Sequence, residues 1–191
     1  RVIRPSVSGL RVGQVYGKAM GPRNAVADAR SMPIESAEFR RILGHWSTGV
    51  AVVTARKPDG SLCGLTANAF SSLSLQPPLV LVCVEHTADT HDCIRAAGTF
   101  AISMLAADDE RSARRFASEQ EGDDKFEGIA WREVVTGSPV LEQALAWVDC
   151  EVTAEHVAGD HTIFIGHVLA GDAVDGEPLL YYRGGYHQIC P

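Results

Sequence analysis

The sequence predicts a single mainly β domain, an antiparallel barrel with peripheral helices. Three observations favour this fold class. Short runs rich in β-branched residues recur along the 191-residue chain, turn-forming pairs separate them, and no regular helical crossover joins one run to the next. With 46% hydrophobic and 21% charged residues, the chain can bury a core and lacks the composition of a disordered protein. We expect about six or seven strands, with two or three helices between them.

The first half of the domain is predicted to begin with a helix and continue as a hairpin. Apolar residues spaced at i, i+3, i+4 and i+7 predict a helix over 36–46, and Ser36 can cap its start. The β-branched run 50–54 predicts a strand. Residues 57–60 have the chemistry of a turn, so 62–68 should return as the hairpin partner.

The middle of the chain is predicted to contain both strands and helices. Pro77 and Pro78 lack backbone N–H donors and cannot lie in a central strand, so they should introduce a buried strand over 79–84. A helix over 90–97 should stop at Gly98. The next expected elements are a strand over 100–105, a helix over 108–118 with acidic residues at its start, and a polar loop over 119–125.

The last third of the chain is predicted to be β. Apolar and polar residues alternate with period two over 146–154, which is typical of a half-buried strand. The elements expected after it are a turn at 159–160, a long strand over 162–170, a short strand over 179–182 and a turn at 184–185.

Charge divides the chain into two parts. Residues 1–32 contain six basic side chains and one acid, a net charge of +5. Residues 33–191 contain 11 basic and 23 acidic side chains, a net charge of −12. We expect 1–32 to be a flexible basic tail and 33–191 to be the folded domain. Because a general nucleic-acid binder needs a basic face, no nucleic-acid partner is expected.

Cysteine usage and hydropathy favour a cytoplasmic protein. The five cysteines are odd in number and form no Cys-x-x-Cys pair, which argues against a disulfide scaffold and for a reducing compartment. We expect Cys83 and Cys150 to be buried like small apolar residues. The longest apolar run, 79–84, is far shorter than the ~20 residues of a membrane span. No secretory signal is visible, so we expect no membrane contact.

Several common catalytic and metal-binding motifs are absent from the sequence. It contains no Gly-x-Gly-x-x-Gly, no Walker A loop, no His-Glu-x-x-His and no Gly-x-Ser-x-Gly. The seven histidines match no compact spacing of metal ligands, so no metal site is expected.

The segment 64–84 is the most informative one about the chemistry of the protein. A strand is expected to end there and to continue as a hydroxyl-rich loop. Small side chains at Ala67 and Ala69 would let a flat ligand approach the backbone. Donors and acceptors are available from Thr66, Asn68, Ser71 and Ser72. These residues alone leave two interpretations open: a loop that binds the edge of a heteroaromatic ring, or a polar β-loop with structural hydroxyls.

Five motifs follow one another along the chain. They are Ser-Thr-Gly-Val at 47–50, Thr-Ala-Asn-Ala-Phe-Ser-Ser at 66–72, Gln-Pro-Pro-Leu-Val-Leu at 76–81, Gly-Asp-His-Thr-Ile-Phe-Ile-Gly at 159–166 and Pro-Leu-Leu-Tyr-Tyr-Arg-Gly-Gly-Tyr-His at 178–187. In this order they closely resemble the flavin reductase-like family, whose fold is the FMN-binding split barrel. The resemblance extends from about residue 39 to residue 189. The family includes reductase components of two-component flavin monooxygenases.

The resemblance implies a set of cofactor-binding residues. The segment 66–72 would hold the isoalloxazine edge, largely through main-chain groups, and Thr48 belongs to the preceding motif. Phe116 falls where relatives pack against the flavin. The full set is Thr48, Thr66, Ala67, Asn68, Ala69, Phe70, Ser71 and Ser72 for the flavin, Thr87 and Thr90 for its phosphate, Phe116 against the ring, and His161 and Tyr186 beside the nicotinamide. As the catalytic residue, His161 is expected to place the nicotinamide and not to act as an obligatory acid or base.

The resemblance also implies an activity and partners. The chain would be an NAD(P)H-dependent flavin reductase that transfers a hydride from NADH or NADPH to FMN or FAD. It would form a homodimer and supply diffusible reduced flavin to a partner monooxygenase. Two alternatives remain open: a reductase that uses bound FMN on another acceptor, such as a corrinoid, and a flavin-binding module without turnover. The sequence does not choose between FMN and FAD, or between NADH and NADPH.

Overall fold

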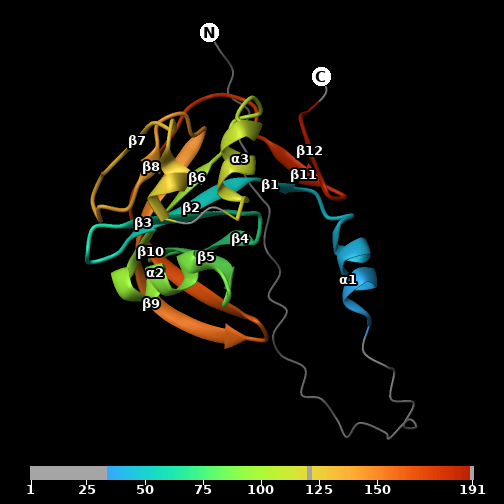
Figure 1. Ribbon diagram of the computed structural model, residues 1–191, viewed down its shortest axis with the longest axis horizontal. Coiled ribbons are helices and arrows are strands. Elements are labelled where there is room, and N and C mark those ends of the chain that lie inside the picture. Colours follow the sequence, from blue (N-terminus) through green and yellow to red (C-terminus); the bar gives the residue numbers. More distant parts are fainter. Residues whose placement is uncertain (1–33, 120–121, 190–191) are drawn as a thin grey trace, which may run out of the picture. The chain divides into compact units, whose positions relative to one another are not determined.

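The computed structural model describes residues 34–119 and 122–189. In this part of the chain it contains three α-helices, one short 3₁₀ helix and twelve strands (Figure 1). The expected basic tail over 1–32 lies outside the described residues. Every recorded strand pairing is antiparallel, which confirms the mainly β, antiparallel prediction. None of the helices in the described ranges is long and apolar enough to cross a membrane.

A seven-stranded sheet forms the body of the domain. Its strands are, in spatial order, β3 (Leu62–Ala67), β2 (Ala51–Arg56), β6 (Thr99–Met104), β9 (Ala146–Ala158), β10 (His161–Ala173), β5 (Pro78–Glu85) and β4 (Phe70–Leu75). The predicted hairpin of β2 and β3 is confirmed, with Ala51 opposite Ala67. The predicted long strands are also confirmed, and β9 and β10 pair with each other along most of their length.

The two edge strands of this sheet, β3 and β4, follow each other directly in the chain. Only Asn68 and Ala69 separate Ala67 from Phe70. The three Cα–Cα steps across this link span at most about 11 Å. The sheet must therefore curl until its two edges approach each other at the link. No pairing between β3 and β4 is recorded among the described residues, so the sheet is curled but is not a closed barrel.

The predicted loop over 66–72 is wrong except at Asn68 and Ala69, because Thr66 and Ala67 still belong to β3. Phe70–Leu75 forms the edge strand β4, paired with β5. Hydroxyl side chains suit an edge strand with one face in water, which composition alone did not distinguish from a loop. Pro78 begins β5, and the first position of a strand tolerates a missing N–H donor.

Two small sheets and three further helical segments complete the domain. Beyond the main sheet, β1 (Thr48–Gly49), β11 (Leu180–Tyr182) and β12 (Gly185–His187) form one sheet, and β7 (Trp131–Arg132) and β8 (Val140–Leu141) form another. The sequence analysis missed β1, β7, β8 and β12, because two or three residues are too few to show a period. The helical segments are α2 (Asp89–Ala97), α3 (Glu110–Phe116) and a 3₁₀ turn over Gly122–Phe126.

The helix boundaries agree with the sequence at some ends and not at others. Helix α2 stops at Gly98, which has a left-handed φ of 66°, as expected. Helix α3 is shorter than the predicted 108–118, because the side chain of Asp109 caps it by accepting the N–H of Ser112 at 3.1 Å. The polar segment expected to be a loop at 119–125 contains the 3₁₀ turn.

Helix α1 (Ser36–Leu43) differs from the prediction in its length and its cap. The N-cap residue is Glu35, so Ser36 is already helical and does not cap the start. The predicted apolar face exists but is exposed: Phe39 is 52% and Trp46 is 75% accessible. No residue of α1 is buried. This face is therefore not covered by any described part of the chain.

The core has two parts, separated by the main sheet. One part packs α2 against the sheet and contains Phe100, Ile102 and Phe164. The other part includes Phe116 of α3 and Leu179, which precedes β11. The two helices that bound the candidate site are thus each anchored by their own apolar contacts.

The cysteines do not all behave as expected. Cys63 of β3 and Cys93 of α2 form a disulfide, and their Cα atoms lie 6.5 Å apart. The expectation that disulfides are absent is wrong for this pair, because only the packing of α2 on β3 brings these residues together. Cys150 is buried as predicted, whereas Cys83 is only half-buried.

The contact at Gly166 gives a test of the packing. A Cβ at Gly166 would lie 2.5 Å from Cζ of Phe100 and 2.9 Å from Cβ of Cys150. We predict that Gly166→Ala lowers the free energy of unfolding by about 1–3 kcal/mol through overpacking, as measured by urea denaturation. Gly49→Ala is the matched control, because a Cβ there meets nothing within 4 Å. Equal stability of the two variants would contradict this account of the core.

Candidate active site

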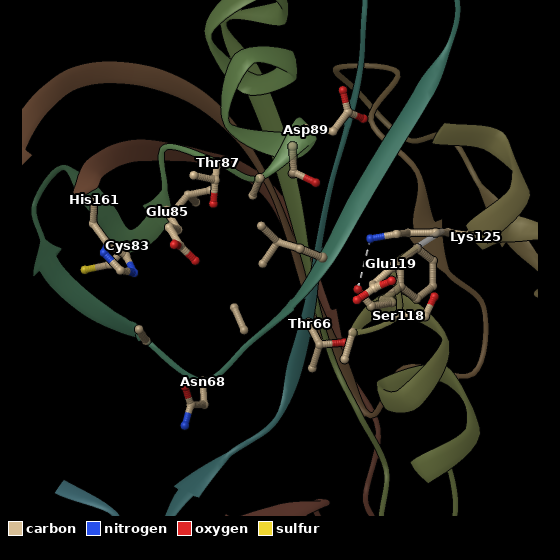
Figure 2. A pocket seen from close by; sticks show the side chains of 18 residues that line it. Thr66, Asn68, Cys83, Glu85, Thr87, Asp89, Ser118, Glu119, Lys125 and His161 are labelled. Atoms are coloured by element: carbon tan, nitrogen blue, oxygen red, sulfur yellow. Dashed lines mark hydrogen bonds between the residues drawn. The ribbon is translucent and has the colours of Figure 1, made fainter. Parts of the chain in front are cut away.

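A cleft of about 460 Å³ opens where the two edges of the main sheet approach each other (Figure 2). Volumes of this size are typical of small-molecule sites. Its walls come from the end of β3 and the following link, the end of β5, the loop into α2, the end of α3 with the residues after it, and His161 at the start of β10. In Figure 2, His161, Glu85 and Thr87 lie on one side of the cleft, and Ser118, Glu119 and Lys125 lie on the other.

The floor of the cleft is formed where β3 packs against α3. Thr66 Oγ1 donates a hydrogen bond of 2.6 Å to the carbonyl of Ala113. Lys125 Nζ donates to the carbonyls of Gly64 (3.1 Å) and Phe116 (3.2 Å), so it joins the strand to the helix end. A Cβ at Gly64 would lie 2.7 Å from Cε1 of Phe116. Glycine at this position is therefore what lets the Phe116 ring lie against β3 beside the cleft.

The opposite wall is held by a buried hydroxyl. Thr162 Oγ1 lies 3.1 Å from Nε2 of His86 and 2.9 Å from Nε2 of His91. The backbone N–H of His86 also donates to the carbonyl of Asp160 at 2.9 Å. These bonds tie the loop between β5 and α2 to the start of β10. Since Thr162 and His91 are both buried, the contact between these two residues is shielded from water, whereas His86 is exposed.

His161 is oriented by its neighbour in the chain. Its Nδ1 lies 2.7 Å from Oδ1 of Asp160. This hydrogen bond lowers the pKa of the Asp160 carboxyl, which therefore stays ionised to a lower pH than usual. A carboxylate only accepts hydrogen bonds, so Nδ1 donates to Asp160, and Nε2 has no hydrogen-bond partner among the described residues.

The cleft contains more acids than bases. Glu85, Asp89 and Glu119 line it, together with the single lysine Lys125. Lys57 Nζ lies 3.0 Å from Oδ1 of Asp89, and this hydrogen bond raises the pKa of Lys57. The ion pair with Lys57 offsets the charge of Asp89 at this wall of the cleft. No group of three or more histidine, cysteine or acidic residues within 34–119 and 122–189 is placed to hold a metal ion.

A smaller hollow of about 210 Å³ adjoins the cleft and shares 66–68 and Ala117 with it. Tyr186 of β12 lines this hollow, and its ring centroid lies 5.5 Å from that of Tyr181. Burial raises the pKa of Tyr186, so its hydroxyl is a hydrogen-bond donor at neutral pH. Thr48 faces Tyr181 in the strand register, and within the described residues its buried Oγ1 has no hydrogen-bond partner.

The structure brings together most of the site residues predicted from the sequence. The main cleft is lined by Thr66, Ala67, Asn68, Ala69, Thr87, Thr90, Phe116 and His161, and the adjoining hollow by Tyr186. Four predicted residues lie outside both linings. Phe70 packs against the core, Ser71 and Ser72 lie on β4, and Thr48 lies on β1. Their proposed contacts with a ligand remain predictions.

Several residues that line the cleft were not found from the sequence. They are Cys83, Glu85, Asp89, Ser118, Glu119 and Lys125. No local pattern marks these positions. They reach the cleft only because the sheet curls and because the end of α3 packs against β3.

Comparison with protein families matches residues 43–190 to the family described as "Flavin reductase like domain". A flavin reductase of Pseudomonas putida is 41% identical over 150 residues, which is 78% of this chain and 86% of that protein. The reductase subunit HsaB of a flavin-dependent monooxygenase of Mycobacterium tuberculosis is 38% identical over 164 residues, covering 84% of this chain and 86% of the relative.

A solved structure gives the same result for the fold. The NADH:FAD oxidoreductase SgcE6 of Streptomyces globisporus, in complex with NAD and FAD fragments, superposes with a TM-score of 0.76 at 37% identity. The superposition covers 81% of this chain and 93% of that one. The three alignments cover 78–84% of the chain described here and 86–93% of these relatives.

The free cysteine in the cleft gives a test of where a flat ligand binds. Cys83 lines the cleft, and burial raises its pKa, so its thiol should react slowly with N-ethylmaleimide near pH 7 and faster as the pH rises. We predict that saturating FAD slows this labelling further, as measured by peptide mass spectrometry, because the ring covers the thiol.

Cys150 is the internal control for this experiment. Burial raises the pKa of Cys150 to about 12, so it should stay unlabelled until the protein unfolds. If bound FAD left the labelling rate of Cys83 unchanged, the cleft would not be the ring-binding site.

Proposed function

This chain belongs to the flavin reductase like domain family, and from that premise we propose that its cleft holds FMN or FAD while NADH or NADPH delivers a hydride there. The protein is accordingly an NAD(P)H-dependent flavin reductase. The observation that carries this conclusion is a family match over 43–190 whose relatives are covered nearly end to end. The cleft at the meeting point of the sheet edges is the place for the chemistry.

We propose that the curled sheet is the split barrel of this family. The support is the link at Asn68 and Ala69, which joins the two edge strands and forces the edges to meet at one end. The same link lines the cleft. A barrel that is split beside this link would place the flavin between its edges.

The residues present fit a flavin ring. Small side chains at Ala67, Ala69, Ala88 and Ala117 leave room for a flat ring against the backbone. The exposed segment Asn68–Ala69 lies outside any strand and can offer main-chain groups to the ring edge. Thr48 lies outside the linings, but its buried hydroxyl has no hydrogen-bond partner within the part of the chain that the structure describes.

Hydride transfer between a nicotinamide and a flavin needs two stacked rings and no protein nucleophile. The chain's own contribution is therefore orientation and electrostatics. The bonds of Thr162 to His86 and His91 fix one wall, and the bond of Thr66 to Ala113 fixes the floor. His161, held by Asp160, is positioned to orient the nicotinamide through its free Nε2.

The physiological acceptor that we propose is a monooxygenase that receives the reduced flavin by diffusion. The support is that a close relative is the reductase subunit of a flavin-dependent monooxygenase. We propose a cytoplasmic setting, where NADH and NADPH are available. The net charge of −12 over residues 33–191 argues against a nucleic-acid partner.

The test of the proposed function is a visible absorbance spectrum followed by NADH and NADPH oxidation with riboflavin, FMN or FAD. We expect flavin-dependent oxidation of the nicotinamide. A yellow, flavin-loaded protein that oxidised neither nucleotide would overturn the reductase assignment and favour a flavin-binding module. Turnover that required a corrinoid in place of free flavin would favour the other alternative.

We predict that His161→Ala raises the KM for NADH by about tenfold and leaves kcat within about tenfold, because the residue places the nicotinamide without acting as an obligatory acid or base. Steady-state kinetics at saturating FAD measures both parameters. The exposed His156 of β9, outside both linings, is the matched control for replacement by alanine. Complete loss of turnover in His161→Ala at saturating NADH, with FAD still bound, would show that the role is chemical.

We also propose a homodimer in which α1 takes part. The support is the exposed apolar face of this helix, which includes Phe39, Ile42 and Leu43, and the exposed Trp46 in the turn that follows it. An isolated helix of eight residues is marginal in water, so a covering partner would explain its stability.

We therefore predict that the purified protein has twice the chain mass of 20.5 kDa in multi-angle light scattering. Phe39→Glu should shift the protein toward the monomer. Val157→Glu is the control, because this exposed apolar residue lies on β9, away from α1 in the sequence. A monomeric wild-type protein would contradict the proposed dimer.

A further inference from the structure

Three arginines of α3 line another hollow beside the cleft. This arginine hollow, of about 470 Å³, is formed by Arg111, Arg114 and Arg115 together with Ser118, Glu127 and Ile129. Ser118 also lines the main cleft, so the two spaces adjoin. Residues 33–191 have a net charge of −12. The seven-residue helix α3 carries three guanidinium groups, so it is a positively charged segment in an acidic domain.

The three guanidinium groups are only partly neutralised by acids. Arg114 lies 2.5 Å from Oε1 of Glu110. Arg115 lies 3.4 Å from Oε2 of Glu127, and its buried Nε has no hydrogen-bond partner in the described part of the chain. Arg111 forms no ion pair with any described residue. The guanidinium groups that line the hollow thus keep N–H donors that are not used within the described residues. Such donors bind phosphate oxygens well.

The main cleft and the arginine hollow have opposite electrostatic character. Glu85, Asp89 and Glu119 line the cleft together with a single lysine, and Asp89 is paired with Lys57, so the cleft offers few cations to a second phosphate-bearing ligand. The arginines offer the only cluster of three basic side chains that lines any hollow described above. A dinucleotide that places its neutral ring in the cleft can therefore place its diphosphate on α3.

Arg114 connects the arginine hollow to the expected nicotinamide position. Its guanidinium carbon lies 5.2 Å from the centroid of the Tyr186 ring. Tyr186 lines the small hollow that adjoins the cleft. In NADH and NADPH a single ribose joins the nicotinamide ring to the diphosphate. A nicotinamide ring beside Tyr186 would therefore bring the diphosphate close to Arg114.

We propose that Arg111 and Arg114 bind the diphosphate of NADH or NADPH and so determine the affinity for the nicotinamide substrate. This inference rests on the proposed reductase function. It assigns to α3 the recognition of the substrate's charge, while the cleft recognises the rings. Neither arginine takes part in hydride transfer.

The experiment compares Arg111→Ala and Arg114→Ala with the wild-type protein in steady-state kinetics. We expect the KM for NADH to rise about tenfold in each variant with kcat within about twofold, because a charge-assisted hydrogen bond to phosphate is lost. The KM values for riboflavin, FMN and FAD should not change. Arg95→Ala is the matched control, since Arg95 is an exposed arginine of α2 paired with Glu155 at 3.2 Å.

Inorganic pyrophosphate provides a second measurement that does not depend on ring binding. It should inhibit the wild-type protein competitively against NADH, and Arg114→Ala should weaken this inhibition. Increasing salt should raise the KM for NADH less steeply in the variants than in the wild-type protein, because fewer charges remain to be screened. Unchanged circular dichroism would show that the variants are folded.

Each other outcome overturns the proposal in a recognisable way. A rise in the KM for FAD alone, with FMN and NADH unaffected, would assign the hollow to the diphosphate of FAD. Unchanged KM values for all substrates in active variants would show that the hollow binds no phosphate and would leave the reductase function intact. A wild-type protein that oxidised neither nucleotide would remove the proposed function and this inference together.

Discussion

The geometry of the whole domain depends on a covalent constraint: two residues, Asn68 and Ala69, connect strands that lie at opposite edges of a seven-stranded sheet. Because this link is so short, the sheet cannot lie flat. Its edges must approach each other there and separate elsewhere, and the cleft is the space between them. The inherent twist of strands assists the curl, but the length of the link fixes the place where the edges meet.

The walls of this space are held by different interactions. On one side Gly64 lets the Phe116 ring lie on β3, and Lys125 bonds the strand to the helix end. On the other side the hydroxyl of Thr162 lies within hydrogen-bond distance of the rings of His86 and His91. Apart from Lys125, these contacts do not use the charged side chains Glu85, Asp89 and Glu119 that line the cleft. The support of the site is thus separate from the groups available to recognise a ligand.

The sequence predicted the strands with a clear period and the helices with clear ends. Period two over 146–154 identified β9, and Gly98 identified the end of α2. It did not predict β4, because the serines of an edge strand resemble those of a loop. It did not predict that Ser36 would lie inside α1 rather than cap it. Strands of two or three residues carry no periodic signal at all.

The candidate site was predictable where it follows a continuous motif, as at 66–69 and His161. Residues such as Cys83, Glu119 and Lys125 reach the cleft only through tertiary packing, and no spacing in the chain marks them. The same holds for the pair Cys63 and Cys93, which are 30 residues apart in the sequence. A motif locates the backbone of a site, whereas the charges around it depend on the fold.

The position of the hairpin of β9 and β10 has a consequence for the order in which the domain assembles. The β2–β3 and β4–β5 pairs form between neighbours in the chain, and so does β9 with β10. The sheet becomes continuous only when this last hairpin docks between β6 and β5, across a long stretch of sequence. Such distant pairings cost the most chain entropy and form late. His161 lies at the start of β10, late in the chain. During synthesis, the β3 and α3 residues that form the floor of the cleft therefore precede His161, which lies on the opposite wall.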